Sequence, residues 1–355
     1  MKSNLTLISS YPIGTGIYRV FENYSHLGFY RRLYYLPSIN FGNVNVSEKP
    51  LYKEIKPEHL PDRLSYVLSF YFGKTLKKKI GEGYIHVLEP GFFHLSRFDI
   101  PTIGTIHDLY PMNSETGNDY SRMYKRFYKK DLQYTKNLLG VTTISYQTAK
   151  DFNKFYPNIT TTTIHHWTQN FFIPKNKNSC RKNLSIPQSK FVLLNVSFSS
   201  GNKNIDFIGK VMDLLDDRFL LIYLGNGTIN NIHKNRIKKI EGFLDNSTLV
   251  DLYNAADLYI APSTAEGFNF PIIEAINCGI PVIASKIAIF EEVLFNSPYL
   301  LRLEPETWAN EIVSLSNKQA ADEAFSWYKA NIGNYYRETR GKLEFENFFN
   351  SLGIK

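Results

Sequence analysis

Cysteines are scarce in this sequence, and it has no apolar run long enough to cross a membrane. Cys180 and Cys278 are the only cysteines among 355 residues, which excludes a disulfide-based scaffold and a zinc site made of cysteines. The stretch between Lys2 and Arg19 has no positive charge, but serines, a proline and two glycines interrupt it. It is therefore neither a span of roughly 20 apolar residues nor the apolar centre of a signal peptide. We expect a soluble protein of a reducing compartment, which indicates the cytoplasm.

The second half of the chain lacks any excess of charge. Residues 169–355 have 20 basic and 20 acidic side chains, whereas residues 1–168 have 21 basic and 13 acidic ones, so the net charge of +8 belongs to the first half. Basic residues are densest at Lys77–Lys79 and from Arg122 to Lys130. The asymmetry indicates either a merely solvated surface or an anionic partner for the first half. Nucleic acid, an anionic membrane and a lipid-linked phosphate are candidates, and nucleic acid has only this charge in its favour.

Short apolar runs alternate with helical patterns along the chain, which is typical of parallel sheets in doubly wound α/β domains. The length allows two domains. The expected strands of the first half are 5–8, 84–88, 102–106 and 141–144, and those of the second are 191–196, 220–224, 258–260 and 281–284.

The domain boundaries follow from composition. We expect a first domain over 1–170, a linker over 171–187 that is rich in Asn, Lys, Ser and Pro, and a second domain over 188–330. Aromatic residues at helical spacing predict a C-terminal helix over 331–355. This helix either caps the second domain or crosses back to the first.

The most informative segment is 256–285, ADLYIAPSTAEGFNFPIIEAINCGIPVIAS. Leu258–Ala261 is expected to be a strand and Pro262–Asn269 the loop at its carboxyl end. Pro271 suits the first turn of a helix, and Gly279 suits its end. A helix that begins at this edge of a parallel sheet offers backbone N–H groups to an anion. The residues expected to do so are Gly267, Phe268, Asn269 and Phe270.

Two carboxylates flank this expected anion site. Glu266 precedes it, and Glu274 is expected in the first turn of the helix. One carboxylate can bind sugar hydroxyls while the other accepts hydrogen bonds from a ribose diol. The alternative is that Glu274 only complements the helix dipole and that Glu266 is exposed to solvent.

The pattern E-G-F-x-x-P-x-x-E-A-x-x-x-G-x-P-V-x-A-S in this segment resembles the signature of retaining glycosyltransferase family 4, also called glycosyl transferases group 1. Upstream, Glu241–Leu244, Leu249–Ile260 and the glycine turn Leu224–Gly227 resemble further family stretches in the same order, over about 95 residues. The resemblance implies the GT-B fold, with two facing Rossmann-like domains. It also implies a nucleotide-sugar donor bound mainly by the second domain, with contacts from Gly225 and Glu274.

Val196–Asn204 resembles the family's G-R-L-x-x-x-K-N segment, where Arg and Lys grip the donor diphosphate. Lys203 matches the family lysine, but Phe198 stands where the arginine is usual. A single lysine is a point charge and cannot form the bidentate fork of an arginine. The resemblance therefore implies a catalytic role for Lys203 together with Glu266.

The first half also resembles the family. Gly14, Thr15 and Gly16 lie in a T-G-I-x-R-V turn after the first strand, where glycines let the backbone approach a phosphate or a sugar. Thr105–Pro111 resembles the family segment T-x-H-D-L-x-P, in which the histidine lies near the transferred sugar. We therefore expect a catalytic role for His107.

Metal-binding signals are missing. No D-x-D triplet occurs, which removes the usual metal–diphosphate handle of the other large glycosyltransferase fold. His165 and His166 are adjacent, and adjacent side chains of a strand point to opposite faces, so they do not form a metal pair. We expect no metal and no other cofactor.

These observations predict a hexosyltransferase of glycan biosynthesis that retains the anomeric configuration and needs no metal. The donor is expected to be GDP-mannose or a UDP-hexose, and the acceptor a saccharide or a lipid-phosphate-linked saccharide. The basic first half then indicates peripheral contact with an anionic membrane at its cytoplasmic face, and nucleic acid is not expected as a partner. The alternatives are a GT-B nucleotide-sugar epimerase or phosphorylase, and a non-catalytic carbohydrate-binding or assembly protein of the same fold.

Overall fold

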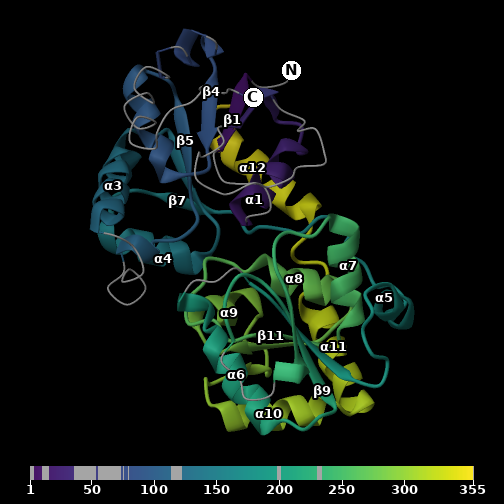
Figure 1. The fold of residues 1–355 in the computed structure, drawn as a ribbon. Helices are drawn as coiled ribbons and strands as arrows, with labels where there is room; N and C mark the ends of the chain where they lie inside the picture. The colour runs from purple at the N-terminus through teal and green to yellow at the C-terminus, as the bar shows by residue number, and fades with distance from the viewer. Residues whose placement is uncertain are drawn as a thin grey trace. The chain divides into compact units, whose positions relative to one another are not determined.

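The computed structural model describes residues 4–9, 16–35, 53–54, 73–74, 76–78, 80–112, 122–197, 201–229 and 234–354. Gly14, Thr15, Lys79 and Phe198 lie outside these residues. The chain divides into two compact units (Figure 1). The first unit comprises Met1–His166 and Thr339–Lys355, and the second comprises Trp167–Glu338.

Within the described residues, the first unit has one parallel sheet of seven strands in the order β3-β2-β1-β4-β5-β6-β7. Its strands are β1 (Leu5–Ser9), β2 (Tyr30–Tyr35), β3 (Lys53–Glu54), β4 (Tyr84–Val87), β5 (Thr102–Ile106), β6 (Gly140–Thr143) and β7 (Thr161–Thr163). Its α-helices are α1 (Gly16–Ser25), α3 (Arg122–Leu132), α4 (Tyr146–Phe155) and α12 (Glu338–Ser351), and its 3₁₀ helices are η1 (Pro90–Phe98), η2 (Tyr110–Met112) and η4 (Gln133–Asn137).

The second unit repeats this plan with six parallel strands among its described residues, in the order β10-β9-β8-β11-β12-β13. Its strands are β8 (Phe191–Val196), β9 (Phe219–Leu224), β10 (Ile237–Ile240), β11 (Leu258–Ala261), β12 (Val282–Ser285) and β13 (Leu300–Leu301). Its α-helices are α5 (Lys177–Asn183), α6 (Ile205–Leu214), α7 (Asn246–Ala255), α8 (Phe270–Asn277), α9 (Ala288–Val293), α10 (Pro305–Leu315) and α11 (Lys318–Asn331), with the 3₁₀ turns η5 (Gly201–Lys203) and η6 (Lys234–Arg236).

All eight predicted strands are present, and the prediction of two Rossmann-like domains is confirmed. β1, β5 and β9 are buried along their whole length, which explains why none of them contains a charged residue. β2 and β10 were not predicted because they contain paired basic residues, YRRLYY and IKKI. β10 is one of the two edge strands of its sheet among the described residues, and an edge tolerates the charged side chains that a central strand excludes.

The strand order of each sheet reverses at one place, between β1 and β4 in the first unit and between β8 and β11 in the second. In open α/β sheets, ligands bind at the carboxyl ends of the strands beside such a reversal. Ligand-binding residues are therefore expected in the loops that follow β4, β5, β8 and β11.

The predicted linker 171–187 is instead part of the second unit. Its helix α5 packs against α7. Arg181 is only 4% exposed, forms an ion pair with Asp257, and donates a hydrogen bond to the Ala255 carbonyl oxygen at 2.8 Å. Buried polar bonds hold this segment together with a few buried apolar side chains such as Phe172 and Ile186, so its mostly polar composition resembled that of a linker.

The C-terminal helix belongs to the first unit, which settles the alternative that its sequence left open. The helix predicted over 331–355 is shorter than expected, because α11 ends at Asn331 and α12 spans Glu338–Ser351. Phe345 of α12 packs edge-on against Tyr24 of α1 with ring centroids 4.5 Å apart, and Figure 1 shows α12 beside α1. None of the helices in the described ranges is long and apolar enough to cross a bilayer.

Candidate active site

The loops that follow β8 and β11 are joined to each other by hydrogen bonds. The Thr264 backbone N–H donates to the Asn202 carbonyl oxygen at 2.8 Å, and the Asn202 side chain donates to the Ala265 carbonyl oxygen at 2.8 Å. The Asn204 side chain donates to the Pro262 carbonyl oxygen at 3.2 Å. Because the strand order reverses between β8 and β11, two loops distant in sequence form one cross-linked edge.

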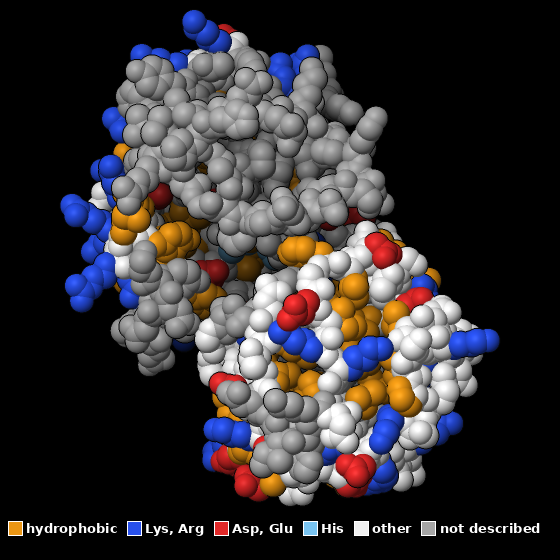
Figure 2. Space-filling model, viewed as in Figure 1, with side chains coloured by type: hydrophobic (Ala, Val, Ile, Leu, Met, Phe, Trp, Pro, Cys, Tyr) orange, Lys and Arg blue, Asp and Glu red, His pale blue; other side chains and the backbone are white. Residues whose placement is uncertain are grey.

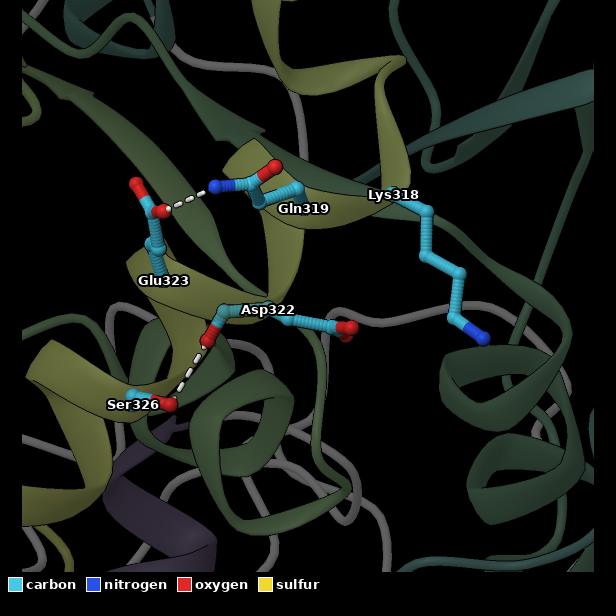
Figure 3. Close-up of a pocket in the computed structure, with 5 residues that line it drawn as sticks. All are labelled: Lys318, Gln319, Asp322, Glu323 and Ser326. Carbon is cyan, nitrogen blue, oxygen red and sulfur yellow. Dashed lines mark hydrogen bonds between the residues drawn. The ribbon is translucent and has the colours of Figure 1, made fainter.

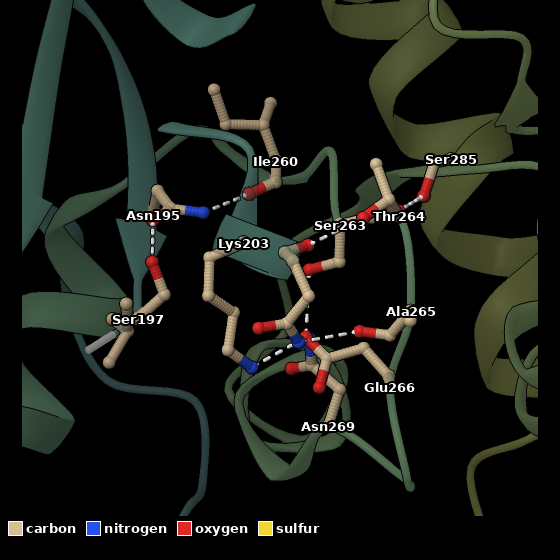
Figure 4. A network of polar contacts seen from close by, with 12 residues as sticks. Asn195, Ser197, Lys203, Ile260, Ser263, Thr264, Ala265, Glu266, Asn269 and Ser285 are labelled. Carbon is tan, nitrogen blue, oxygen red and sulfur yellow. Dashed lines mark hydrogen bonds and ion pairs between the residues drawn. The ribbon is translucent and has the colours of Figure 1, made fainter. Parts of the chain in front are cut away.

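Glu266 lies at the centre of this edge (Figure 4). Its Oε1 atom accepts hydrogen bonds from Lys203 Nζ at 2.6 Å, Ser263 Oγ at 2.7 Å and Asn269 Nδ2 at 2.9 Å. The Glu266 side chain is only 6% exposed. All three of these bonds reach Oε1, so the carboxylate is held through one oxygen, and no hydrogen bond from a described residue occupies Oε2.

Lys203 places a positive charge against this carboxylate. Its side chain is 21% exposed, and its contact with Glu266 uses one of the three N–H groups of the ammonium. The remaining N–H groups can therefore donate to phosphate oxygens. The structure thus brings together two of the predicted catalytic residues across 63 positions of sequence.

The predicted anion loop leads into α8 as expected, with Pro271 in the first turn and Gly279 in the left-handed region at φ 88°. Asn269, which precedes the helix, is also left-handed at φ 74°. The rings of Phe268 and Phe270 are buried and pack edge-on with centroids 5.4 Å apart. These two residues can therefore contribute only backbone groups to a ligand, and donor binding by 267–270 stays a prediction.

Glu274 lies in the second turn of α8, because the helix begins at Phe270, so its expected place in the first turn was wrong. It is 0% exposed, and its Oε2 atom accepts a hydrogen bond from Tyr253 Oη at 2.6 Å. In this position the carboxylate also supports the packing of α7 on α8. Ribose binding by Glu274 stays a prediction.

Gly225 lies in the tight turn after β9, and this turn is built around Tyr223. The hydroxyl of Tyr223 accepts a hydrogen bond from the Gly227 N–H at 2.8 Å and donates to the Ser197 carbonyl oxygen at 3.2 Å. A Cβ atom on Gly225 would lie 1.9 Å from that carbonyl oxygen. The glycine is therefore required by the approach of the two loops, whatever its role toward the donor.

Replacing Gly225 with alanine is expected to lower the free energy of unfolding by about 1–3 kcal/mol, the usual cost of overpacking a tight site. Urea denaturation would measure the change. Gly91→Ala is the control, because a Cβ atom at Gly91 would meet nothing within 4 Å. Equal stabilities of the two variants would contradict the geometry of this turn.

In the first unit, His107 follows β5 and lines a cavity of about 50 Å³. The side chain is 8% exposed and its ring donates a hydrogen bond to the Leu88 backbone. Its Nε2 atom is buried and has no hydrogen-bond partner among the described residues. With the other ring nitrogen donating, Nε2 is an acceptor, and the group that suits it is a hydroxyl. The catalytic role of His107 stays a prediction.

Glu89 shares this cavity and was not predicted from the sequence. It is 5% exposed, and its Oε1 atom accepts a hydrogen bond from Ser9 Oγ at 2.8 Å. The signal was its place directly after the predicted strand 84–88, at the edge where β1 and β4 meet. Of the predicted glycine turn, only Gly16 is described, as the exposed first residue of α1.

Three histidines of the first unit are buried in one neighbourhood. Burial lowers the pKa of His86 to about 3 and that of His107 to about 4, and it holds the pKa of His166 well below its usual value. The rings of His107 and His166 stack with centroids 5.6 Å apart. All three imidazoles are therefore neutral at pH 7, and His107 acts there as a hydrogen-bonding group and not as a cation.

The free energy of unfolding is expected to fall as the pH is lowered from 6.5 toward 4. In that range the unfolded chain binds protons on these histidines and the folded chain does not, so stability is complete above pH 6.5 and is lost below it. Each such histidine contributes a slope of about 1.4 kcal/mol per pH unit. Urea denaturation between pH 7.5 and 5 would measure the slope, and His86→Asn should reduce it. A flat profile above pH 5 would contradict the burial of uncharged histidines.

His165 and His166 diverge in the structure, since His165 packs edge-on against Tyr146 while His166 stacks on His107. In the part of the chain that the structure describes, no group of three His, Cys, Asp or Glu side chains could hold a metal ion.

A hollow of about 620 Å³ also lies in the second unit, along α11. Figure 3 shows that its five lining residues all belong to that helix. Gln319 already donates to Glu323 at 3.0 Å, and Ser326 donates to the Asp322 carbonyl oxygen at 2.7 Å. A depression lined by one helix face does not enclose a ligand, so we assign it no role.

Comparisons with known proteins agree with this architecture. The family described as glycosyl transferases group 1 matches residues 190–318, which extend from β8 to the start of α11. The chain is 29% identical over 100 residues to O-antigen chain mannosyltransferase B of Escherichia coli, a match that covers 24% of this chain and about a quarter (26%) of that relative's length.

Two solved structures resemble almost the whole chain. Sucrose-phosphate synthase of Thermosynechococcus elongatus has a TM-score of 0.79 at 17% identity, and the match covers 98% of both chains. HepE of Anabaena, in complex with UDP and glucose, has a TM-score of 0.76 at 14% identity, covering 98% of this chain and 100% of that one. At these identities the likeness establishes the fold. The family match covers most of the unit that contains the Lys203–Glu266 pair, so this unit is similar to the glycosyl transferases of group 1, and the chain has the GT-B fold.

Proposed function

We propose that this protein is a retaining, metal-independent glycosyltransferase that transfers a hexose from a nucleotide-diphosphate sugar to a hydroxyl of a saccharide or a lipid-phosphate-linked saccharide. The observation that carries the proposal is the Lys203–Glu266 pair. A buried carboxylate is held by three hydrogen bonds to one oxygen, beside an ammonium with further N–H groups, at the reversal of strand order in the family-matched unit. This arrangement suits a ligand that combines an anionic diphosphate with a hydroxyl-rich sugar.

Each group has a defined task in this reaction. The bond between the anomeric carbon and the donor phosphate oxygen breaks, and negative charge grows on that oxygen. Lys203 and the backbone N–H groups at the start of α8 stabilise this charge. Glu266, through Oε2, accepts hydrogen bonds from sugar hydroxyls and favours positive charge on the ring. Glu274 accepts hydrogen bonds from the ribose.

Retention follows if the acceptor attacks from the side on which the diphosphate departs. The acceptor oxygen bonds to the anomeric carbon, and its proton passes to the departing phosphate oxygen. No covalent nucleophile is then required. His107, neutral and with Nε2 as an acceptor, fits a sugar hydroxyl in this scheme.

A panel of nucleotide sugars tests the proposal. GDP-mannose and UDP-hexoses come first, because the E. coli relative is named a mannosyltransferase and the HepE structure contains UDP and glucose. The true donor should raise the melting temperature, since it binds only the folded state, and should be hydrolysed slowly. Product analysis with and without an acceptor is decisive: conversion of the donor sugar alone would indicate an epimerase, a requirement for free phosphate a phosphorylase, and binding without turnover a non-catalytic protein.

Activity is expected to persist in EDTA. In the proposed site Lys203 and backbone N–H groups meet the diphosphate charge, and the sequence has no D-x-D triplet to hold a metal against it. Initial rates after dialysis against EDTA, with and without added Mn²⁺ or Mg²⁺, would measure this. Complete loss that either ion restores would contradict the proposed diphosphate site.

A further inference from the structure

Helix α3 presents two rows of exposed side chains that the proposed reaction does not use. Arg122, Arg126 and Lys130 recur at every fourth position and form a basic row. Met123 and Phe127, 60% and 43% exposed, form an apolar row one residue further round the helix. Figure 2 shows basic side chains gathered along the side of the first unit where Figure 1 places α3.

The opposite face of α3 fixes the helix to the fold and reaches the His107 cavity. Asp131 and Leu132 are buried, and Tyr128 Oη donates to the Asp108 carbonyl oxygen at 2.6 Å. Tyr124 stacks on Tyr128 with ring centroids 6.1 Å apart, and both tyrosines line the cavity. A surface that binds the basic row and the apolar row would therefore be separated from the His107 cavity by helix α3.

We infer that α3 is the surface by which this protein docks on an anionic lipid bilayer. An interfacial helix places basic side chains among lipid phosphates and its apolar side chains at the boundary with the acyl chains. The two rows of α3 have this arrangement. A soluble polyanion such as nucleic acid would engage the basic row but leave Met123 and Phe127 exposed to water.

The described part of the Lys77–Lys79 run, Lys77 and Lys78, lacks this combination. Lys77 forms an ion pair with Asp99 at 3.3 Å, and the neighbouring apolar residues Leu76 and Ile80 are buried. Docking through α3 would bring the His107 cavity to the level of the lipid head groups. This last step rests on the proposed function, since only a lipid-linked acceptor makes that position useful.

Co-sedimentation with vesicles tests the inference without any substrate. The protein is mixed with phosphatidylcholine vesicles that contain 0, 15 or 30% phosphatidylglycerol, at low and high salt. Binding should rise with the anionic lipid and fall with salt. Arg126→Glu with Lys130→Glu should lower the partition coefficient at least about tenfold, because each basic residue near such a surface contributes appreciably. Met123→Ser with Phe127→Ser should weaken binding at unchanged charge.

The matched control is Lys318→Glu with Lys329→Glu, which makes the same charge change on exposed positions of α11 in the second unit. Circular dichroism melting would show that all variants are folded. No vesicle binding at any composition, or equal losses in the α11 control, would overturn the inference. Binding that the Met123/Phe127 variant leaves unchanged and that single-stranded DNA displaces would assign the helix to a soluble polyanion instead.

Glycosyl transfer to a water-soluble acceptor is measured in parallel. The α3 variants should keep this activity while transfer to an acceptor embedded in vesicles falls. Loss of vesicle binding with intact soluble transfer supports docking through α3. Vesicle binding by a protein without any transfer would leave docking standing and would count against the proposed function alone.

Discussion

Lys203→Ala is expected to lower kcat/KM for glycosyl transfer by roughly 30- to 1000-fold, which corresponds to about 2–4 kcal/mol of transition-state stabilisation. The ammonium lies 2.6 Å from Glu266 Oε1, and in the proposed reaction it meets the negative charge that grows on the departing diphosphate. Its removal also leaves Glu266, 6% exposed, without its cationic partner. The missing positive charge and the unpaired Glu266 both weaken the stabilisation of the same transition state, so each contributes to the loss of kcat/KM.

Steady-state kinetics with saturating acceptor would measure this loss. Lys210→Ala is the matched control, because Lys210 is an exposed lysine on α6 seven residues further along the chain. Lys203→Arg should retain part of the activity, since it keeps the charge. A nearly unchanged kcat/KM for Lys203→Ala would mean that the diphosphate is held elsewhere.

Glu266→Ala is expected to lower kcat by about 100-fold or more while changing the KM for the donor little. Contacts near the anomeric carbon strengthen as positive charge develops on the ring, so their loss is felt in the transition state more than in the bound donor. The substitution also removes the acceptor that positions Lys203, Ser263 and Asn269. Its effect and that of Lys203→Ala should therefore be strongly non-additive in a double-mutant cycle.

Glu274 provides the contrast. Glu274→Gln should raise the KM for the donor with a smaller change in kcat, because ribose contacts are similar in the ground and transition states. Glutamine is used in place of alanine because Glu274 is fully buried and accepts a hydrogen bond from Tyr253, so truncation would also lower stability. Melting temperatures of both variants separate the two effects. Equal, near-wild-type kinetics for Glu266→Ala and Glu274→Gln would contradict the assignment of the site.

Local patterns in the sequence were sufficient for the central strands of both sheets. A run such as FVLLNV of β8 is apolar on both faces, and only a strand covered by helices on both sides accommodates it. The start and the end of α8 were predictable for a similar reason, since Pro271 and Gly279 act through their own backbone geometry. The edge strand β10 was not predictable, because the sequence IKKI has no pattern that distinguishes an edge strand from a loop.

The contacts between distant segments could not be predicted from these patterns. The segment 171–187 has the composition of a linker, yet Arg181 anchors it through buried hydrogen bonds to residues more than 70 positions away. Likewise, contacts such as that between Phe345 and Tyr24 decide that α12 belongs to the first unit. Composition reports how polar a segment is and says nothing about the partners that satisfy its polar groups.

The sequence by itself determined the fold class, the family resemblance and the types of side chain available for catalysis, because these depend on residue types and their spacing along the chain. Only the tertiary structure decided that Lys203 and Glu266 share one hydrogen-bonded site and that His107 is uncharged beside Glu89. The pairing arises from the reversal of strand order between β8 and β11, and the neutrality of His107 from its removal from water. Both are properties of three-dimensional packing, which sets the distances and the solvent exposure on which charge and hydrogen bonding depend.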